Sequence, residues 1–223
     1  MSSSDHEKPD CPVGEHECRL VDELVTLRHS NCELEKLVHT DTLTGLFNYR
    51  HFALVLEQEL ERTRRTGQPT SMILMDLDFF KRINDTWGHE SGNLVLRQSA
   101  ELIKKTLRKI DVPCRYGGEE FAIILPGTSL PLAVSVANRL RESIMEEPVA
   151  LEDEQINYTA SMGVDSYIMG DAVSAEGFVK QVDSQLYRAK EEGRNRVCHK
   201  PIDYLKPETE VSSDEKRALL GKT

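Results

Sequence analysis

The sequence lacks several features that would each point to a particular class of protein. No stretch approaches the roughly 18 apolar residues that a membrane-spanning helix needs, and residues 1–6 contain no apolar signal region. Basic residues are in the minority: 28 Lys and Arg against 38 Asp and Glu give a net charge of −10. This balance argues against binding nucleic acid or anionic lipid through the overall field, so we expect no nucleic acid and no membrane as partner.

A disulfide framework is also missing. The chain has five cysteines, an odd number for 223 residues, and they are typical of reduced thiols in the cytoplasm. Apolar residues make up 39% of the chain, enough for one core, and the length suits one ordinary domain plus an extra element. A local cluster of Lys and Arg on such a domain can still bind a small phosphorylated ligand.

Two segments precede the expected globular domain. Residues 1–14 are polar and contain two prolines and a glycine, which predicts a flexible leader. Residues 15–40 are predicted to form a coiled-coil stalk, because apolar residues and one Asn follow the alternating spacing of four and three that marks a heptad seam: Leu20, Leu24, Leu27, Asn31, Leu34 and Val38. A buried Asn at a seam position favours a parallel two-stranded register. The alternative is an amphipathic helix that packs on its own domain.

Residues 41–200 have the pattern of an α/β sandwich, and residues 201–223 form a polar tail. Cap-type residues and a glycine at 41–45 end the stalk helix. The following periodicity predicts helices at 46–65, 79–87, 91–108, 130–147 and 175–192, and strands at 71–78, 158–167 and 196–199. Residues 114–125 are predicted to be two strands joined by a Gly-Gly hairpin turn. This order indicates a mixed sheet with flanking helices.

Two tight pairs of acidic residues carry the chemistry. Asp76-Leu-Asp78 ends a predicted strand, and Glu119-Glu120 lies at the hairpin turn after Gly117-Gly118. Carboxylates at such spacing repel one another unless a cation neutralises them, so each pair suggests a hard divalent metal ion. The glycines let the backbone approach a ligand closely, and freed amide groups can cradle phosphate. Basic residues are available to neutralise further phosphate charge: Lys81, Arg115, Lys190 and Arg194.

These features predict a metal–nucleotide site for phosphoryl or nucleotidyl transfer, whereas a plain acidic hairpin tip would leave them unrelated. The segment Arg115-Tyr-Gly-Gly-Glu-Glu-Phe121 resembles the signature of GGDEF-domain diguanylate cyclases, in its GGEEF form. Companion segments appear in the family's order at 41–48, 76–85, 88–89 and 187–195. The resemblance covers residues 41–200 and implies a nucleotidyl-cyclase-like domain with a central mixed sheet.

The resemblance implies that two GTP molecules, held on two facing domains, condense to cyclic di-GMP and two pyrophosphates. The second domain would come from a homodimer formed through residues 20–38. By the same likeness, Asp76, Glu119 and the backbone carbonyl of Leu77 would hold Mg²⁺ or Mn²⁺. Glu119 or Glu120 would deprotonate the attacking hydroxyl, and the sequence leaves open which of the two does so.

Substrate-binding residues are also implied by the resemblance. Lys81, Lys190 and Arg194 would bind phosphates, and Asn84 would contact the guanine edge. The nucleotide would lie against the turn at Gly117 and Gly118, and Phe80 belongs to the same substrate-binding set.

A product-inhibitory site is implied by a second group of residues. Arg108-Lys-Ile-Asp111 is an R-x-x-D sequence at the family's spacing before the signature, and Arg139 falls where the family places a further arginine. Arginine suits this task because its planar fork binds phosphate and stacks on guanine. Outside this family, an ordinary surface ion pair would be the better explanation of an R-x-x-D sequence.

One position departs from the family pattern. Asn93 stands where an Asp usually follows Gly88-His89. A carboxylate accepts from both donors on the Watson–Crick edge of guanine, whereas an amide offers one acceptor and one donor and can pair with adenine instead. Asn93 therefore leaves open a mixed cyclic AMP–GMP synthase as an alternative to a diguanylate cyclase. A further alternative is a catalytically silent module that binds cyclic di-GMP or GTP, although Asp76, Glu119 and Glu120 favour an enzyme.

Overall fold

The computed structural model describes residues 19–151 and 154–201, apart from the side chains of residues 29–38. The predicted leader at 1–14, the first residues of the predicted stalk and nearly all of the predicted tail lie outside this description. Within the described ranges, no helix combines the length and apolar character needed to cross a membrane.

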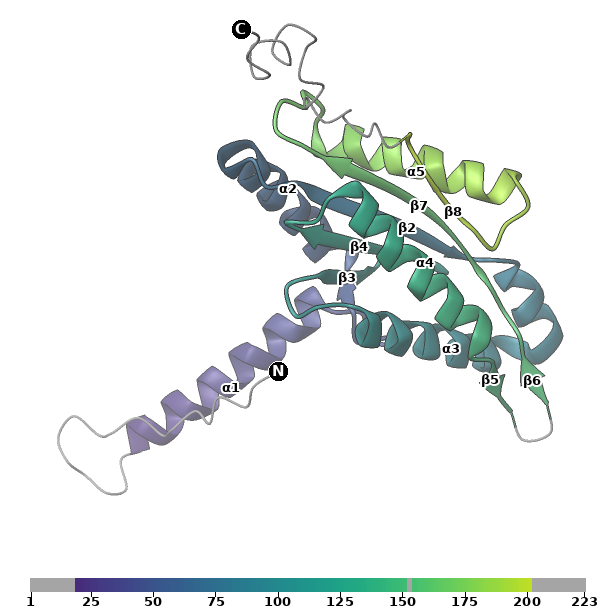
Figure 1. The fold of residues 1–223 in the computed structure, drawn as a ribbon. Coiled ribbons are helices and arrows are strands. Elements are labelled where there is room, and N and C mark those ends of the chain that lie inside the picture. Colours follow the sequence, from purple (N-terminus) through teal and green to yellow (C-terminus); the bar gives the residue numbers. More distant parts are fainter. Residues whose placement is uncertain (1–18, 152–153, 202–223) are drawn as a thin grey trace, which may run out of the picture.

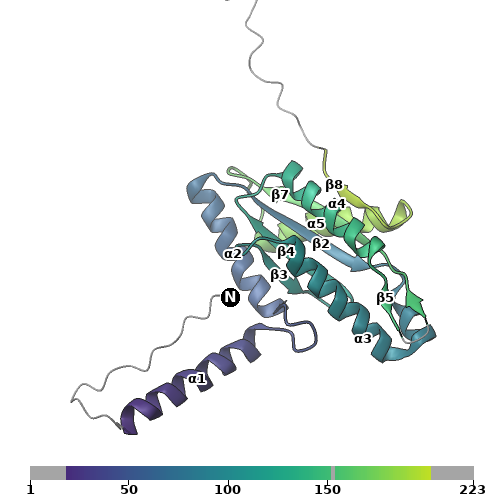
Figure 2. The same ribbon diagram turned by 60° about the horizontal axis from the view of Figure 1, so that its bottom comes forward.

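The segment predicted as a stalk contains one continuous helix, α1 (Arg19–His39). It extends away from the sheet in both views (Figure 1, Figure 2). The first apolar seam positions are exposed in the single chain, with Leu20 at 71%, Leu24 at 48% and Leu27 at 59%. The helix is thus confirmed, while its pairing with a second copy stays a prediction.

The core of the domain is a six-stranded mixed sheet in the order β1-β3-β4-β2-β7-β8. Its outer pairs, β1 with β3 and β7 with β8, are parallel, and the remaining pairs are antiparallel. The strands are β1 (Phe47–Asn48), β2 (Thr70–Leu77), β3 (Val112–Arg115), β4 (Glu120–Pro126), β7 (Ala160–Tyr167) and β8 (Val197–His199). A separate hairpin pairs β5 (Val149–Ala150) with β6 (Gln155–Ile156). The predicted mixed sheet is confirmed.

Helices cover both faces of the sheet (Figure 1). One face packs against α3 (Phe80–Thr106) and α4 (Leu130–Glu146), the other against α2 (Tyr49–Thr66) and α5 (Ala175–Glu191). Side chains of β2 alternate between the two cores: Ile73 and Met75 join the first, Met72 and Leu74 the second. Burial on both faces explains why the middle of the strand, Met72–Met75, is a continuous apolar run rather than alternating with polar residues.

Two predicted elements differ from the structure. The helix predicted from Leu46 begins only at Tyr49, because Phe47 and Asn48 form β1 beside β3, and Asn48 caps α2 by accepting a hydrogen bond from His51 N at 3.1 Å. A two-residue strand is too short to produce a periodic pattern. The helices predicted at 79–87 and 91–108 form a single element, α3, kinked at Gly88 with φ 82° and ψ 164°. The break itself is thus confirmed at its predicted place.

Candidate active site

Asp76 lies near the end of the central strand β2, between the neighbouring strands β4 and β7. Its register partners are Glu120 on β4 and Ser161 on β7, and the residue is 8% exposed. The Nζ atom of Lys190, from the last turn of α5, lies 2.7 Å from Asp76 Oδ2. The structure therefore brings together a carboxylate and a predicted phosphate-binding cation from segments more than 100 residues apart in sequence.

The hairpin turn between β3 and β4 places Glu119 beside this strand end. Leu77 N donates to Glu119 O at 3.3 Å, and Gly117 N donates to Glu120 O at 3.1 Å. A Cβ atom on Gly117 would lie 2.6 Å from Glu120 Oε2, so a side chain there would displace the Glu120 carboxylate. A Cβ on Gly118 would meet no atom of the described residues within 4 Å, which leaves open space above that backbone.

The three carboxyl groups at this site all have a raised pKa. Burial raises the pKa of Asp76 above its ordinary value, and the nearby Lys190 opposes this effect. Burial, followed by the charge of Asp76, raises the pKa of Glu119 and that of Glu120. The ionised form of each carboxyl group is therefore destabilised, and a bound cation would stabilise it.

The oxygen-rich donor set fits a hard divalent cation such as Mg²⁺. Across residues 19–151 and 154–201, no three His, Cys, Asp or Glu side chains are already gathered in a metal-binding arrangement. At Asp76 the positive charge next to the carboxylate is that of Lys190. Asp76, Glu119 and the carbonyl of Leu77 are the groups at this strand end and turn that would hold the metal.

Asp78 differs from its neighbour Asp76, although the sequence suggested a metal for the pair. It is 4% exposed, and its carboxylate accepts hydrogen bonds from Thr159 Oγ1 at 2.7 Å, Ser161 Oγ at 2.6 Å and Asn195 N at 3.0 Å. The expectation that both acids of this pair face a metal is therefore wrong for Asp78. Its oxygens hold β7 and the loop after α5.

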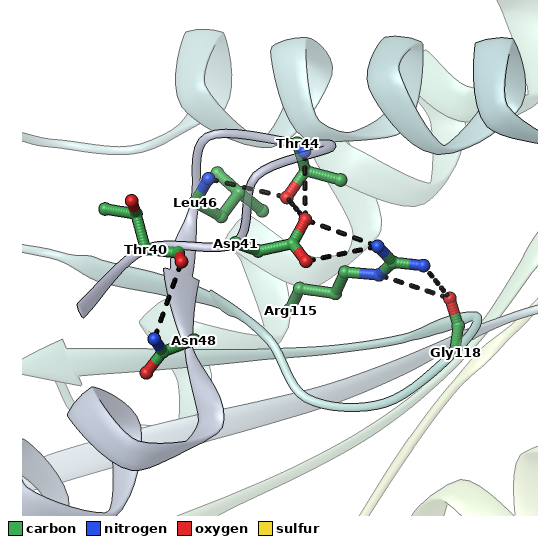
Figure 3. Close-up of polar contacts among 7 residues, drawn as sticks. All are labelled: Thr40, Asp41, Thr44, Leu46, Asn48, Arg115 and Gly118. Carbon is green, nitrogen blue, oxygen red and sulfur yellow. Dashed lines mark hydrogen bonds and ion pairs between the residues drawn. The ribbon is translucent and has the colours of Figure 1, made fainter. Parts of the chain in front are cut away.

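The turn is also bound to the segment that follows the stalk helix (Figure 3). Arg115 Nη2 donates to Gly118 O at 2.8 Å, and Arg115 Nη1 lies 3.2 Å from Asp41 Oδ2. Asp41 Oδ1 in turn accepts from Thr44 N at 2.9 Å. Burial alone would raise the pKa of Asp41, but the Thr44 hydrogen bonds and the Arg115 charge lower it. Arg115, predicted as a phosphate-neutralising residue, thus supports the turn.

The predicted base-contacting residues lie on both sides of the kink in α3. A Cβ atom on Gly92 would lie 2.0 Å from Asn84 Oδ1, so the absence of a side chain at Gly92 makes room for the Asn84 amide. Asn93 follows directly and is half-buried. Phe80 is 6% exposed and belongs to the core beneath these residues. Gly88 and Gly92 therefore bring the two amides to one region.

The remaining predicted phosphate-binding residues border the same strand end. Lys81 is exposed in the first turn of α3. The guanidinium of Arg194 lies 4.5 Å from the ring centroid of Phe79. Phe79 has a positive φ of 56° and is 55% exposed. Phe79 was not identified as a site residue from the sequence, because its strained backbone and its contact with Arg194 leave no local pattern.

The R-x-x-D group lies in the short segment between α3 and β3. Asp111 Oδ2 accepts from Arg108 N at 2.8 Å, so the acid binds the backbone of Arg108 rather than its guanidinium. The Arg108 side chain is exposed. Arg139 reaches across from α4 and donates to Thr106 O at 2.9 Å. The two arginines therefore lie near the same helix end.

Comparisons with known proteins agree with this fold. The family model described as diguanylate cyclase, GGDEF domain, matches residues 38–196. The response regulator PleD of Caulobacter vibrioides is 44% identical over 167 residues, which cover 74% of this chain and 37% of PleD. Diguanylate cyclase A of Treponema denticola is 39% identical over 177 residues, covering 78% of this chain and 47% of the relative. The chain thus spans less than half the length of these two relatives.

Solved structures lead to the same class. The coiled coil and GGDEF domain of DgcB from Caulobacter crescentus, in complex with c-di-GMP, matches with a TM-score of 0.75 and 28% identity, covering 81% of this chain and 97% of DgcB. Diguanylate cyclase SiaD from Pseudomonas aeruginosa, crystallised with its activator SiaC, matches with a TM-score of 0.71 and 37% identity, covering 81% and 69%. The fold is thus the α/β fold of GGDEF domains, with a mixed central sheet and flanking helices. The chain belongs to the GGDEF-domain diguanylate cyclase family.

Proposed function

We propose that this protein is a diguanylate cyclase that condenses two GTP molecules into cyclic di-GMP and two pyrophosphates. The observation that carries the proposal is the meeting of Asp76, at the end of β2, with Glu119 and Glu120 of the adjacent turn, beside Lys190. Three carboxyl groups with raised pKa values next to a Lys suit a site that binds a metal–triphosphate. Its relatives named as diguanylate cyclases support the same reaction.

In the proposed reaction, the ribose 3′-oxygen of one GTP attacks the α-phosphorus of the other, and the bond from that phosphorus to the β-phosphate bridging oxygen breaks. Asp76, Glu119 and the Leu77 carbonyl would hold Mg²⁺ or Mn²⁺, which would supply positive charge to the phosphates and to the departing pyrophosphate. Glu119 or Glu120 accepts the hydroxyl proton, and a raised pKa suits that function. Lys81, Lys190 and Arg194 bind the phosphates.

Two domains are required because each contributes one nucleotide to the ring. We assign their pairing to residues 20–38 of α1, whose exposed apolar side chains include Leu20, Leu24 and Leu27. A parallel coiled coil would hold the second domain at high effective concentration. The crystallised DgcB fragment likewise contains a coiled coil and a GGDEF domain, which supports this assignment.

The test is a product assay with purified protein, GTP and Mg²⁺, analysed by mass spectrometry. We expect wild type to form cyclic di-GMP and the Glu119→Gln variant to form none, because an amide neither accepts the proton nor binds the metal as a carboxylate does. Glu61→Gln is the matched control, since Glu61 is 57% exposed at its side chain on the distant end of α2. Normal product formation by Glu119→Gln would contradict the assignment.

A mixed cyclic AMP–GMP product is the second candidate, and Asn93 is the observation that favours it. Losing a charged acceptor opposite guanine can reduce base selectivity by about 1–3 kcal/mol. The same assay with GTP and ATP together tests this candidate. If wild type makes only cyclic di-GMP, Asn84 maintains guanine selectivity. If it makes the mixed product, Asn93→Asp should restore cyclic di-GMP as the main product.

We further propose that cyclic di-GMP inhibits the enzyme at Arg108, Asp111 and Arg139. The exposed Arg108 and the neighbouring Arg139 present two guanidinium groups suited to phosphate and guanine. Arg108→Ala should raise the concentration of cyclic di-GMP needed for half-inhibition about tenfold, as loss of a charge-assisted hydrogen bond would. Lys109→Ala, at the next exposed residue, serves as the control. Unchanged inhibition of Arg108→Ala would overturn this assignment.

A further inference from the structure

Asp78 joins three segments that meet at the end of the central strand. Its backbone N donates to Thr159 O at 2.9 Å, while its carboxylate accepts from Thr159, Ser161 and the backbone N of Asn195. The donors come from β7, from the residue before it, and from the loop after α5. A carboxylate so occupied and 4% exposed is a structural anchor rather than a free ligand.

The loop that Asp78 holds has an unusual backbone. Gly193, Arg194 and Asn195 have consecutive positive φ values of 114°, 61° and 45°. For residues with a side chain, this conformation costs on the order of 1–2 kcal/mol each, so surrounding contacts must maintain it. The hydrogen bond from Asn195 N to Asp78 is one such contact, and Arg141 Nη1 to Asn195 Oδ1 at 3.0 Å is another.

This loop sets the direction of the Arg194 side chain. Arg194 N donates to Ala189 O at 3.0 Å, and the guanidinium lies over the ring of Phe79. Phe79 is the residue directly after Asp78. The two neighbours therefore contact the same loop: Asp78 binds its backbone at Asn195, and Phe79 packs against the guanidinium of Arg194. Lys190, one turn earlier in chain order, already reaches Asp76.

We propose that Asp78 is a positioning residue for triphosphate binding: by holding Asn195 N, it keeps Arg194 stacked on Phe79 and facing the site of Asp76 and Glu119. The assignment rests on the proposed function, because it takes Arg194 as a phosphate-binding residue. It makes the two acids of Asp76-Leu-Asp78 unequal, with Asp76 facing the metal and phosphates and Asp78 acting through Arg194.

Two substitutions of Asp78 separate its hydrogen bonds from its charge. Asp78→Ala removes the acceptor for Asn195 N. Asp78→Asn retains it: the amide oxygen can accept from Thr159 and Asn195, while the amide nitrogen donates to the Ser161 hydroxyl, which accepts equally well. We therefore expect Asp78→Ala to lose positioning and Asp78→Asn to preserve most of it. Hydrogen–deuterium exchange should be faster at residues 193–196 in Asp78→Ala alone.

The ligand measurement uses the full chain with Mg²⁺ and two probes, 3′-deoxy-GTP, which lacks the attacking hydroxyl, and GMP. We expect Asp78→Ala to weaken 3′-deoxy-GTP binding about tenfold and leave GMP binding unchanged, because GMP lacks the outer phosphates to which we assign Arg194. Asp165→Ala is the matched control. Asp165 is a buried acid, 2% exposed, near the other end of β7, where it pairs with Lys200 at 2.9 Å.

A double-mutant cycle with Arg194→Ala tests whether Asp78 acts through that arginine. Asp78→Ala combined with Arg194→Ala should bind 3′-deoxy-GTP no more weakly than Arg194→Ala alone. Should Asp78→Ala not fold, Thr159→Val replaces it in the cycle, because it removes one Asp78 partner without a cavity and should produce a smaller loss of the same selectivity.

The outcomes distinguish this inference from the proposed function. Wild type that binds 3′-deoxy-GTP no better than GMP would overturn the proposed function. Three results would overturn the positioning assignment alone, provided that wild type binds the triphosphate strongly. They are unchanged binding by the Asp78 or Thr159 variant, equal losses of affinity for both probes, and additive effects in the double-mutant cycle.

Discussion

Asp76 and Asp78 are two residues apart on one strand end, yet their environments give them different chemistry. Asp76 has a raised pKa and pairs with Lys190, whereas Asp78 accepts hydrogen bonds from neighbouring segments. Glu119 resembles Asp76, because burial and the nearby charge raise its pKa too. The ionised carboxylates of Asp76 and Glu119 are therefore destabilised at this site, and a bound metal ion would stabilise them.

The raised pKa of Glu119 predicts how the stability of the fold depends on pH. Folding raises the pKa of Glu119, so the folded chain binds that proton more tightly, and raising the pH through this range lowers the free energy of unfolding. Glu119→Gln removes the charge and should therefore be more stable than wild type at pH 7 without metal. The difference should shrink below the ordinary value of 4.5, where the carboxyl is neutral in both states.

Urea unfolding at pH 7 and pH 4 measures this difference, with Glu61→Gln as the exposed control. Adding Mg²⁺ at pH 7 should stabilise wild type more than Glu119→Gln, since a ligand that binds only the folded state raises stability. A Glu119→Gln protein that is less stable than wild type at pH 7 without metal would contradict the charge argument.

The β3–β4 turn depends on contacts with another element. Arg115 links Gly118 of the turn to Asp41, which follows α1, and both side chains of the ion pair are about one-fifth exposed (Figure 3). Because the guanidinium bonds both partners at once, it fixes the turn relative to the end of the stalk helix. The position of Glu119 is thus coupled to the segment where α1 ends.

A double-mutant cycle tests this coupling. Asp41→Ala and Arg115→Ala should each lower the free energy of unfolding and slow turnover, with an interaction energy of about 1–2 kcal/mol between them. The control is the exposed pair Lys180–Glu176 at 2.7 Å, where we expect less than about 0.5 kcal/mol. Additive effects at Asp41 and Arg115, measured by urea unfolding, would show that the ion pair does not hold the turn.

For the molecule as a whole, one chain supplies one site and an α1 helix whose first apolar seam residues face solvent. Other helices already cover both faces of the sheet. The α1 helix instead extends away from this core (Figure 2). The proposed reaction needs two such sites facing each other, which makes activity a property of the assembly.

Removing residues 1–38 should therefore yield a folded monomer whose turnover falls steeply on dilution. Fusing the same domain to a parallel two-stranded coiled coil should restore turnover at low concentration, because the linked domains meet at high effective concentration. An antiparallel coiled coil is the control. Light scattering and the product assay measure both properties, and a truncated monomer that stays fully active when dilute would refute the stalk assignment.

Most elements of the fold follow from local patterns. The buried run of β2, the Gly-Gly turn before Glu119, the break at Gly88 and the last strand at Val197 were all predictable, because apolar periodicity and glycine act over a few residues. The short strand β1 and the β5–β6 hairpin were not, since two-residue strands depend on partners distant in sequence.

The sequence alone sufficed for the class of the protein and for the residue types of its site, because these depend on composition and on motifs a few residues long. Tertiary structure determined which contacts, and therefore which function, each of those residues has. It paired Lys190 with Asp76, turned Arg115 toward Asp41 and committed Asp78 to the loop of Arg194. Each of these contacts joins segments 70 or more residues apart, and the charge and hydrogen bonding of a side chain depend on neighbours that only folding brings together.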